Sequence, residues 1–164
     1  MNIEPAEVKA AMQPDLADPQ VVEGMGDMVT RLVRVCQLFE RDQITVHGVT
    51  TSQCHCLLEL EKQDGQSMQE ISQRLNLRTS TVTRIAGLLV RDGYLVRALD
   101  VQDRRCVCLH LTDKGREKAL LLKESIRAYY AKMVRHIPDG RMASIRQAVL
   151  ELQAAFEAAN PNCC

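Results

Sequence analysis

The sequence predicts a mainly helical fold that carries one small β-hairpin. Apolar residues recur every three or four positions over most of the chain, which is the period of an amphipathic helix. The segments 94–99 and 106–111 instead alternate apolar and polar residues, as strands do. Within 67–91, two short helical stretches are separated by a tight turn. Together these patterns indicate a helix-turn-helix followed by a hairpin wing, with longer helices on both sides.

Length and composition limit the class of protein. The chain has 164 residues, which favours one domain with a helical appendage. Aromatic residues make up only 3% of it and tryptophan is absent, so the core must be aliphatic. Residues 1–20 lack the apolar stretch of a secretion signal, and no run approaches the roughly 18 apolar residues of a membrane span. We therefore expect a cytoplasmic protein with no membrane partner.

Charge is unevenly distributed along the chain. The formal net charge is zero, which by itself gives no hint of a nucleic-acid partner. Residues 67–105, however, contain seven arginines and no lysine against four acidic residues, a local excess of +3. A basic segment in a neutral chain indicates a surface for phosphate, although a solvated helix face would have the same composition.

The N-terminal part is expected to be an arm, a helix and a loop. Residues 1–20 contain three prolines and little periodicity, which predicts a flexible arm. The dimerisation segment 21–48 follows, with apolar residues at helical spacing as far as Glu40 and then a loop over 42–48.

Residues 49–112 are the predicted winged helix-turn-helix. The segment 113–158 is expected to hold two more helices, and the tail 159–164 ends in two cysteines. The apolar stripes of the first and last helices are broader than one small domain needs, which predicts dimerisation helices. A homodimer would present two copies of the domain, and these would match a palindromic site on double-stranded DNA.

Capping signals divide the predicted winged helix-turn-helix into helices. A threonine or serine within 50–52 can cap a helix that runs to about Lys62. Ser67 is followed three residues later by Glu70, as in a capping box. We expect Asn76 to be a left-handed turn residue before the next helix.

The second helix of the pair and the wing carry the expected DNA contacts. The helix from Arg78 to Arg91 opens with short hydroxyl side chains, which allow close approach to phosphates and base edges. The link 100–105 ends in two arginines that can enter a narrow minor groove. The DNA-binding candidates are Ser67, Arg78, Ser80, Thr81, Thr83, Arg84, Asp103, Arg104 and Arg105.

These motifs resemble the MarR family of winged-helix regulators. The wing of that family is similar to 100–105, DVQDRR, followed by 109–115, LHLTDKG. Its recognition helix and exit are similar to 80–84, STVTR, followed by Leu88 and by 91–95, RDGYL. The start of its second helix is similar to Thr51-Ser52-Gln53 with Leu57 and Leu60, and the resemblance extends over about 21–158.

The resemblance implies an obligate dimer that represses nearby genes and is released by a small effector. By motif position, the polar residues of 80–84 would face the major groove. Arg104 or Arg105 would reach the minor groove, steadied by Asp103. The alternative is that the wing arginines only pair with Asp100 and Asp103.

The sequence departs from the family pattern at two positions. Arg78 stands where many members have a small capping residue. Cys54 stands where an aromatic residue is common, beside the region that hosts effector pockets in this family. A thiol there is smaller than a phenyl ring and would leave space.

Six of the seven cysteines occur in close pairs. Cys106, Cys108 and His110 would share one face of a strand, with Val107, Leu109 and Leu111 on the core face. Residues two apart on a helix lie about 200° apart, so the first pair would diverge. Cys36 is expected to be a core residue. The candidate thiol-sensing residues are Cys54, Cys56, Cys106, Cys108, Cys163 and Cys164.

Soft thiolate ligands favour thiophilic ions. The working hypothesis is a repressor that requires no cofactor and leaves DNA when trivalent arsenic or antimony engages its thiols. Zinc or copper is a less favoured effector, since no CxxC or paired-histidine spacing is present.

Other interpretations of the cysteines and of the function remain open. The cysteines could simply pack, with a small aromatic ligand as the effector, or they could sense oxidants through a reactive thiolate. A protein-interaction module without DNA binding is a remote alternative. No catalytic motif is present at recognisable spacing, so an enzyme is not expected.

Overall fold

The computed structural model describes residues 18–99 and 106–159. The wing-tip candidates Asp103, Arg104 and Arg105 and the tail cysteines Cys163 and Cys164 lie outside the described residues. The chain divides into two units, residues 1–39 and 40–164.

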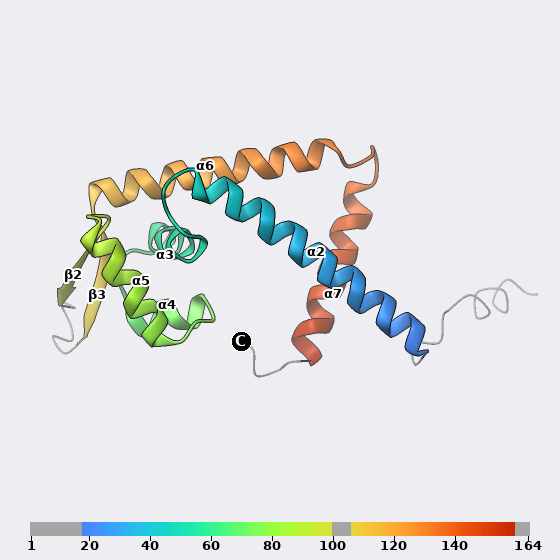
Figure 1. The fold of residues 1–164 in the computed structure, drawn as a ribbon, viewed down its shortest axis with the longest axis horizontal. Helices are drawn as coiled ribbons and strands as arrows, with labels where there is room; N and C mark the ends of the chain where they lie inside the picture. Colours follow the sequence, from blue (N-terminus) through green and yellow to red (C-terminus); the bar gives the residue numbers. More distant parts are fainter. Residues whose placement is uncertain (1–17, 100–105, 160–164) are drawn as a thin grey trace, which may run out of the picture. The chain divides into compact units, whose positions relative to one another are not determined.

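Six helices and three strands make up the described part of the chain, and Figure 1 labels most of them. In chain order they are α2 (Pro19–Thr45), α3 (Thr51–Lys62), β1 (Gln66–Ser67), α4 (Met68–Arg74), α5 (Thr79–Arg91), β2 (Leu95–Leu99), β3 (Val107–Leu111), α6 (Asp113–Arg135) and α7 (Met142–Ala159). The predicted fold class, mainly α with a small hairpin wing, is confirmed.

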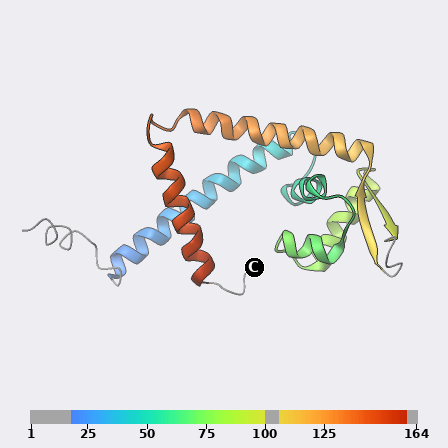
Figure 2. The ribbon, with the colours of Figure 1, turned by 180° about the vertical axis from the view of Figure 1, so that it is seen from behind.

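The second unit is built around α3. This helix packs against α5 and against α6, and Figures 1 and 2 show α3 almost end-on beneath α6. The buried hydrophobic side chains are aliphatic or cysteine, as the composition requires, with none of the chain's aromatic residues among them. The largest apolar ones are Ile44, Leu57, Leu60, Ile71, Ile85, Leu89, Leu95, Leu109 and Leu122.

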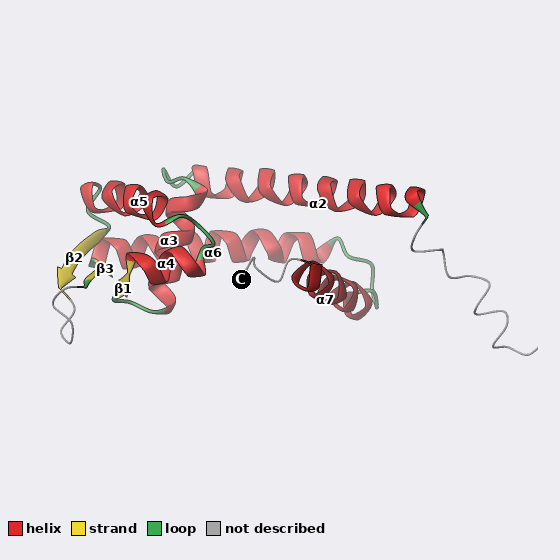
Figure 3. Ribbon diagram, turned by 90° about the horizontal axis from the view of Figure 1, so that it is seen from below, coloured by secondary structure: helices red, strands yellow, loops and turns green. Residues whose placement is uncertain are grey.

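The sheet has one strand more than the sequence predicts. Its order is β1-β3-β2, and all pairs are antiparallel (Figure 3). The hairpin pairs Leu95 with Leu111 and Leu99 with Val107. The additional strand β1 has only two residues, which is too short to show an alternating pattern in the sequence.

The central position of β3 corrects the expected strand faces. Val107, expected in the core, is exposed, whereas Cys108 is buried. Cys108 lies between Ala98 of β2 and Ser67 of β1, so neighbouring strands flank it on both sides. Val107 pairs only with Leu99 near the wing tip, beyond the core.

Capping side chains begin the helices where the sequence indicates. Thr50 caps α3 through a reciprocal capping box with Gln53, and Ser67 caps α4 in the same way with Glu70. The Thr112 hydroxyl accepts a hydrogen bond from the Gly115 amide at the start of α6.

The first helix is longer than expected at both ends. Asp18 accepts hydrogen bonds from the Gln20 and Val21 amides, and Pro19 occupies the first helical position, where its missing N–H costs nothing. At the other end, Ile44 is fully buried, so the helix continues to Thr45 through half of the expected loop.

No helix among the described residues is long and apolar enough to cross a membrane.

The start of α6 offers a test of the packing. We expect Gly115→Ala to destabilise the fold by about 1–3 kcal/mol, because the new Cβ would overlap the carbonyl oxygen of Tyr94. Gly26→Ala in α2 is the matched control, since its Cβ would meet no atom within 4 Å. Thermal unfolding of both variants measures the difference, and a Gly115→Ala midpoint equal to wild type would contradict the packing.

Candidate nucleic-acid interface

Helix α5 has one buried face and one face open to solvent. Val82, Ile85, Ala86 and Leu89 are buried in the core. On the other side, residues three and four apart form a continuous surface. That outer face of α5 consists of Ser80, Thr83, Arg84 and Gly87, of which the first three are exposed.

A tight turn from α4 fixes where α5 begins. Asn76 adopts the left-handed conformation with φ of 50°, as expected from the sequence. The Ser72 and Thr79 hydroxyl oxygens lie 3.3 Å apart and join the two helices. Arg78 occupies the N-cap position with extended backbone and makes no capping hydrogen bond through its side chain. Its guanidinium group is therefore not used to start the helix.

A buried carboxylate connects α3 to α4. Glu59 accepts hydrogen bonds from Arg74 at 3.0 Å and from Lys62 at 2.9 Å. Burial alone would raise the pKa of Glu59, but these hydrogen bonds and the two positive charges hold it below its ordinary value. The ion pair keeps α4, and the turn that follows it, in place relative to the core.

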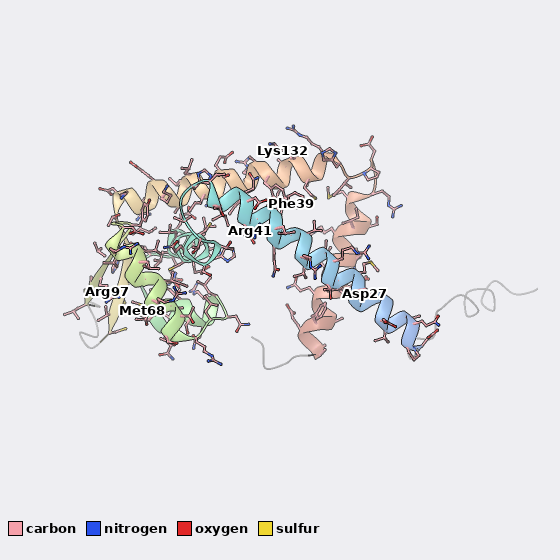
Figure 4. The ribbon with its side chains drawn as sticks, viewed as in Figure 1. Asp27, Phe39, Arg41, Met68, Arg97 and Lys132 are labelled. Atoms are coloured by element: carbon pink, nitrogen blue, oxygen red, sulfur yellow. The ribbon has the colours of Figure 1, made fainter. Side chains whose placement is uncertain are left out.

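Arg97 joins the candidate surface, although it is not among the sequence candidates. It lies on β2 opposite Leu109, at the hairpin beside α5 (Figure 4). A Cβ built on Gly87 would lie 4.0 Å from its guanidinium Nη2. Arg97 therefore extends the outer face of α5, and a larger residue at position 87 would meet it. The local excess of arginine was the only sequence signal for it.

Three arginines at this surface have no acidic partner among the described residues. Within the described part of the chain, Arg78, Arg84 and Arg97 have no acidic group within 4 Å, whereas Arg74 and Arg91 are each paired. Unpaired guanidinium groups are available for phosphates and base edges. Ser67, another candidate, uses its hydroxyl to cap α4 and to donate to Glu70 at 2.8 Å.

Asp64 anchors the base of the wing, and the sequence did not single it out. Its Oδ1 accepts a hydrogen bond from the Leu111 amide at 2.9 Å. Its Oδ2 lies 3.3 Å from His110 Nδ1 and 3.9 Å from Arg116. These contacts join the turn after α3 to the end of β3. The orientation of the wing is therefore tied to the core at a point remote in sequence.

The cysteines do not gather into one site within the described residues. Cys54 and Cys56 are fully buried on different sides of α3, and Cys106 is half-buried. Cys36, expected in the core, is exposed, because the apolar stripe of α2 is not covered in the single chain. Among the described residues, no group of three or more Cys, His, Asp and Glu side chains is placed to hold a metal ion.

Burial also controls the chemistry of the α3 thiols. It raises the pKa of Cys54 and of Cys56 to about 12. The negative charge of Glu40 adds to the effect at Cys54. Glu40 itself lies 2.9 Å from His55 Nε2. Both thiols are therefore protonated, and unreactive as nucleophiles, at neutral pH.

A shallow hollow of about 240 Å³ lies between the end of α5 and α6. It is lined by Tyr94, Lys114, Glu117, Lys118 and Leu121. The ammonium groups of the two lysines lie 4.7 Å and 5.6 Å from the centre of the tyrosine ring. The hollow therefore combines an aromatic wall with two cations and one carboxylate.

Comparisons with known proteins agree with this geometry. Residues 47–105 match the model of the MarR family. The chain is 36% identical over 99 residues to the uncharacterized HTH-type transcriptional regulator YkoM of Bacillus subtilis, covering 54% of this chain and 64% of YkoM. It is 28% identical over 110 residues to the HTH-type transcriptional repressor MdtR of the same organism, covering 67% and 71% of the two chains.

A solved structure extends the similarity to most of the chain. The structure of Streptococcus pneumoniae FabT in complex with DNA has a TM-score of 0.73 at 24% identity, covering 84% of this chain and 99% of FabT. At that identity the likeness shows the fold. The curated relatives are named as transcription regulators, in agreement with the expectation that this chain is not an enzyme. The family match over residues 47–105 and the shared fold agree with the resemblance of the wing and recognition-helix motifs to the MarR family.

Proposed function

We propose that the chain is a homodimeric transcriptional repressor that binds a palindromic DNA operator through α5 and the hairpin wing. The outer face of α5 carries this proposal. It presents Ser80, Thr83 and Arg84 to solvent, with Arg97 beside it. A helix with such a face fits the major groove, where guanidinium and hydroxyl groups read base edges. The relative MdtR is named a repressor, and the structure of FabT contains DNA.

The exposed apolar faces of the outer helices support a homodimer. None of the side chains of α7 is buried, and α2 buries only Ile44. Large apolar side chains on these helices are exposed: Val22, Met25, Met28, Leu32, Val149, Leu150 and Phe156 are examples. Extensive apolar surface of this kind usually forms an interface. A two-fold dimer would place two copies of α5 on two half-sites, so we expect the operator to be palindromic.

The direct test selects DNA from a pool of random duplexes and measures binding to the selected sequence at increasing salt. A repressor of this type should yield a palindromic sequence, and its binding constant should fall steeply with salt as counterions are released. Light scattering gives the mass of the protein in the same buffer. Failure to enrich any duplex would favour a protein-interaction module instead.

Arg84→Ala should weaken operator binding and reduce the slope of log K against log salt by about one per half-site, because one phosphate or base contact is lost. Arg127→Ala on α6 removes the same charge from an exposed residue that pairs with Glu124, and it serves as the control. If both variants reduce the slope equally, the effect comes from net charge and not from α5.

We further propose that trivalent arsenic or antimony releases the operator by engaging cysteine thiols. Each thiol replaces one hydroxyl group of arsenous acid and its proton leaves in a water molecule, so no oxidant is needed. The full burial of Cys54 and Cys56 supports a link to DNA binding. A metalloid can reach these thiols only if the core around α3 opens, and α5 packs on α3. Binding of the metalloid to these thiols would therefore favour a state that does not hold α5 in place.

Two rival effectors have different structural support. An oxidant needs a thiolate, which the raised pKa of Cys54 and Cys56 disfavours. A small aromatic anion would suit the hollow lined by Tyr94, Lys114 and Lys118.

The three effectors can be separated on the selected duplex by titrating arsenite in a phosphine reductant, then benzoate, then peroxide without reductant. A thiol site should bind about one to two equivalents of arsenite. Release of the duplex at that stoichiometry would support the proposal. Release by benzoate or peroxide alone would refute it.

The buried thiols make a separate prediction about pH. Their pKa of about 12 lies above the ordinary value of 9.0 that the unfolded chain should show. The stability gained by keeping them neutral is therefore complete below pH 9 and is lost between pH 9 and 12. At pH 8, iodoacetamide should label the half-buried Cys106 faster than both α3 thiols, as peptide mass spectrometry can follow.

Glu40→Gln should speed the labelling of Cys54, because it removes a negative charge that raises the pKa of that thiol. Cys56 is the internal control, since burial is the cause of its shift. Equal acceleration at both cysteines would indicate general loosening of the fold and would refute the electrostatic explanation.

A further inference from the structure

The side chain of Thr83 is held in a defined orientation on the outer face of α5. Its hydroxyl donates a hydrogen bond to the carbonyl oxygen of Thr79, one turn earlier, at 2.8 Å. Threonine in a helix has two staggered rotamers that make this bond, and both direct the hydroxyl back along the helix. The hydroxyl hydrogen is therefore occupied, and the methyl group remains as the apolar tip of an exposed residue.

The neighbours of Thr83 on this face are polar. Ser80 lies one turn before it, and its hydroxyl has no hydrogen-bond partner within the described residues. Arg84 follows, and the guanidinium of Arg97 lies near Gly87 one turn later. The Thr83 methyl is thus a small apolar spot between a hydroxyl and two cations.

Base edges in the major groove contain one matching apolar group. The C5-methyl of thymine is the only methyl group there, and threonine methyl groups are among its usual contacts. We propose that Thr83 recognises thymine in each operator half-site by contact between the two methyl groups. This inference rests on the proposed function, because it requires α5 to enter the major groove.

The occupied hydrogen also limits what else Thr83 can read. The hydroxyl oxygen could still accept a hydrogen bond from adenine N6 or cytosine N4. It could not donate one to guanine or to thymine O4 without breaking the bond to Thr79. If the methyl group makes the contact, removing the methyl group should abolish it and removing the hydroxyl should not. If the hydroxyl oxygen makes the contact, the opposite should hold, so the two contacts can be separated.

The experiment replaces thymine by uracil, which removes only the C5-methyl. The selected duplex is synthesised with uracil at one thymine position at a time, symmetrically in both half-sites. Wild-type protein should lose affinity about fourfold per half-site at the contacted position, and about fifteenfold for the doubly substituted duplex, as expected for one buried methyl group on each side.

Two variants assign the response to Thr83. Thr83→Ser keeps the hydroxyl and removes the methyl, so its affinity should no longer change on uracil substitution at that position. Thr83→Val keeps methyl groups at both outward rotamer positions and should retain the uracil response. Arg127→Ala, remote from this face, should show the wild-type response. Thermal unfolding of each variant confirms that it is folded.

The outcomes distinguish this inference from the proposed function. A duplex that binds tightly but tolerates uracil at every position, or a Thr83→Ser variant with the full uracil response, would overturn the inference alone. Loss of the response in Thr83→Val but not in Thr83→Ser would assign the contact to the hydroxyl and would overturn it as well. If no duplex can be selected, the proposed function and the inference both fail.

Discussion

The packing of α3 between α5 and α6 is the constraint on which the winged helix-turn-helix depends. The side of α3 that faces each neighbour is filled by aliphatic and cysteine side chains with no exposed surface. Glu59 connects the same helix to α4 by accepting a hydrogen bond from Arg74. The positions of both helices of the helix-turn-helix are thus set from one element, and a disturbance of α3 would reach the recognition helix directly.

The two buried thiols of α3 connect this constraint to regulation. A thiol with a pKa of about 12 is inert while the core is closed. Its reactivity therefore measures how often the core opens, and DNA that holds α5 in place should protect it. A reagent that captures the open state would act against DNA by mass action, whatever its chemical identity. Burial of a sensing residue is consequently compatible with a switch, provided that opening and DNA binding exclude each other.

Local signals in the sequence predicted most of the fold. Thr50, Ser67 and Thr112 cap helices because the side-chain oxygen and the amide that it accepts from are only three residues apart. The additional strand, the role of Asp64 and the position of Arg97 depend on contacts between residues distant in sequence, which periodicity does not encode. The outward position of Ser80, Thr83 and Arg84 follows from the buried stripe of α5, whereas the orientation of the Thr83 hydroxyl required atomic positions.

Affinity and specificity would come from different groups on the same surface. Arg78, Arg84 and Arg97 carry charges that attract any phosphate backbone, and this part of their contribution depends on salt and little on sequence. The fixed side chain of Thr83 has no charge and can contribute only where a base edge matches it. Because Thr83 is oriented by its own helix, no ordering of that side chain is needed on binding, and mismatched bases meet an apolar group that cannot adapt. A surface of this composition can associate with DNA through its arginines and then discriminate among sequences through its small, preorganised residues.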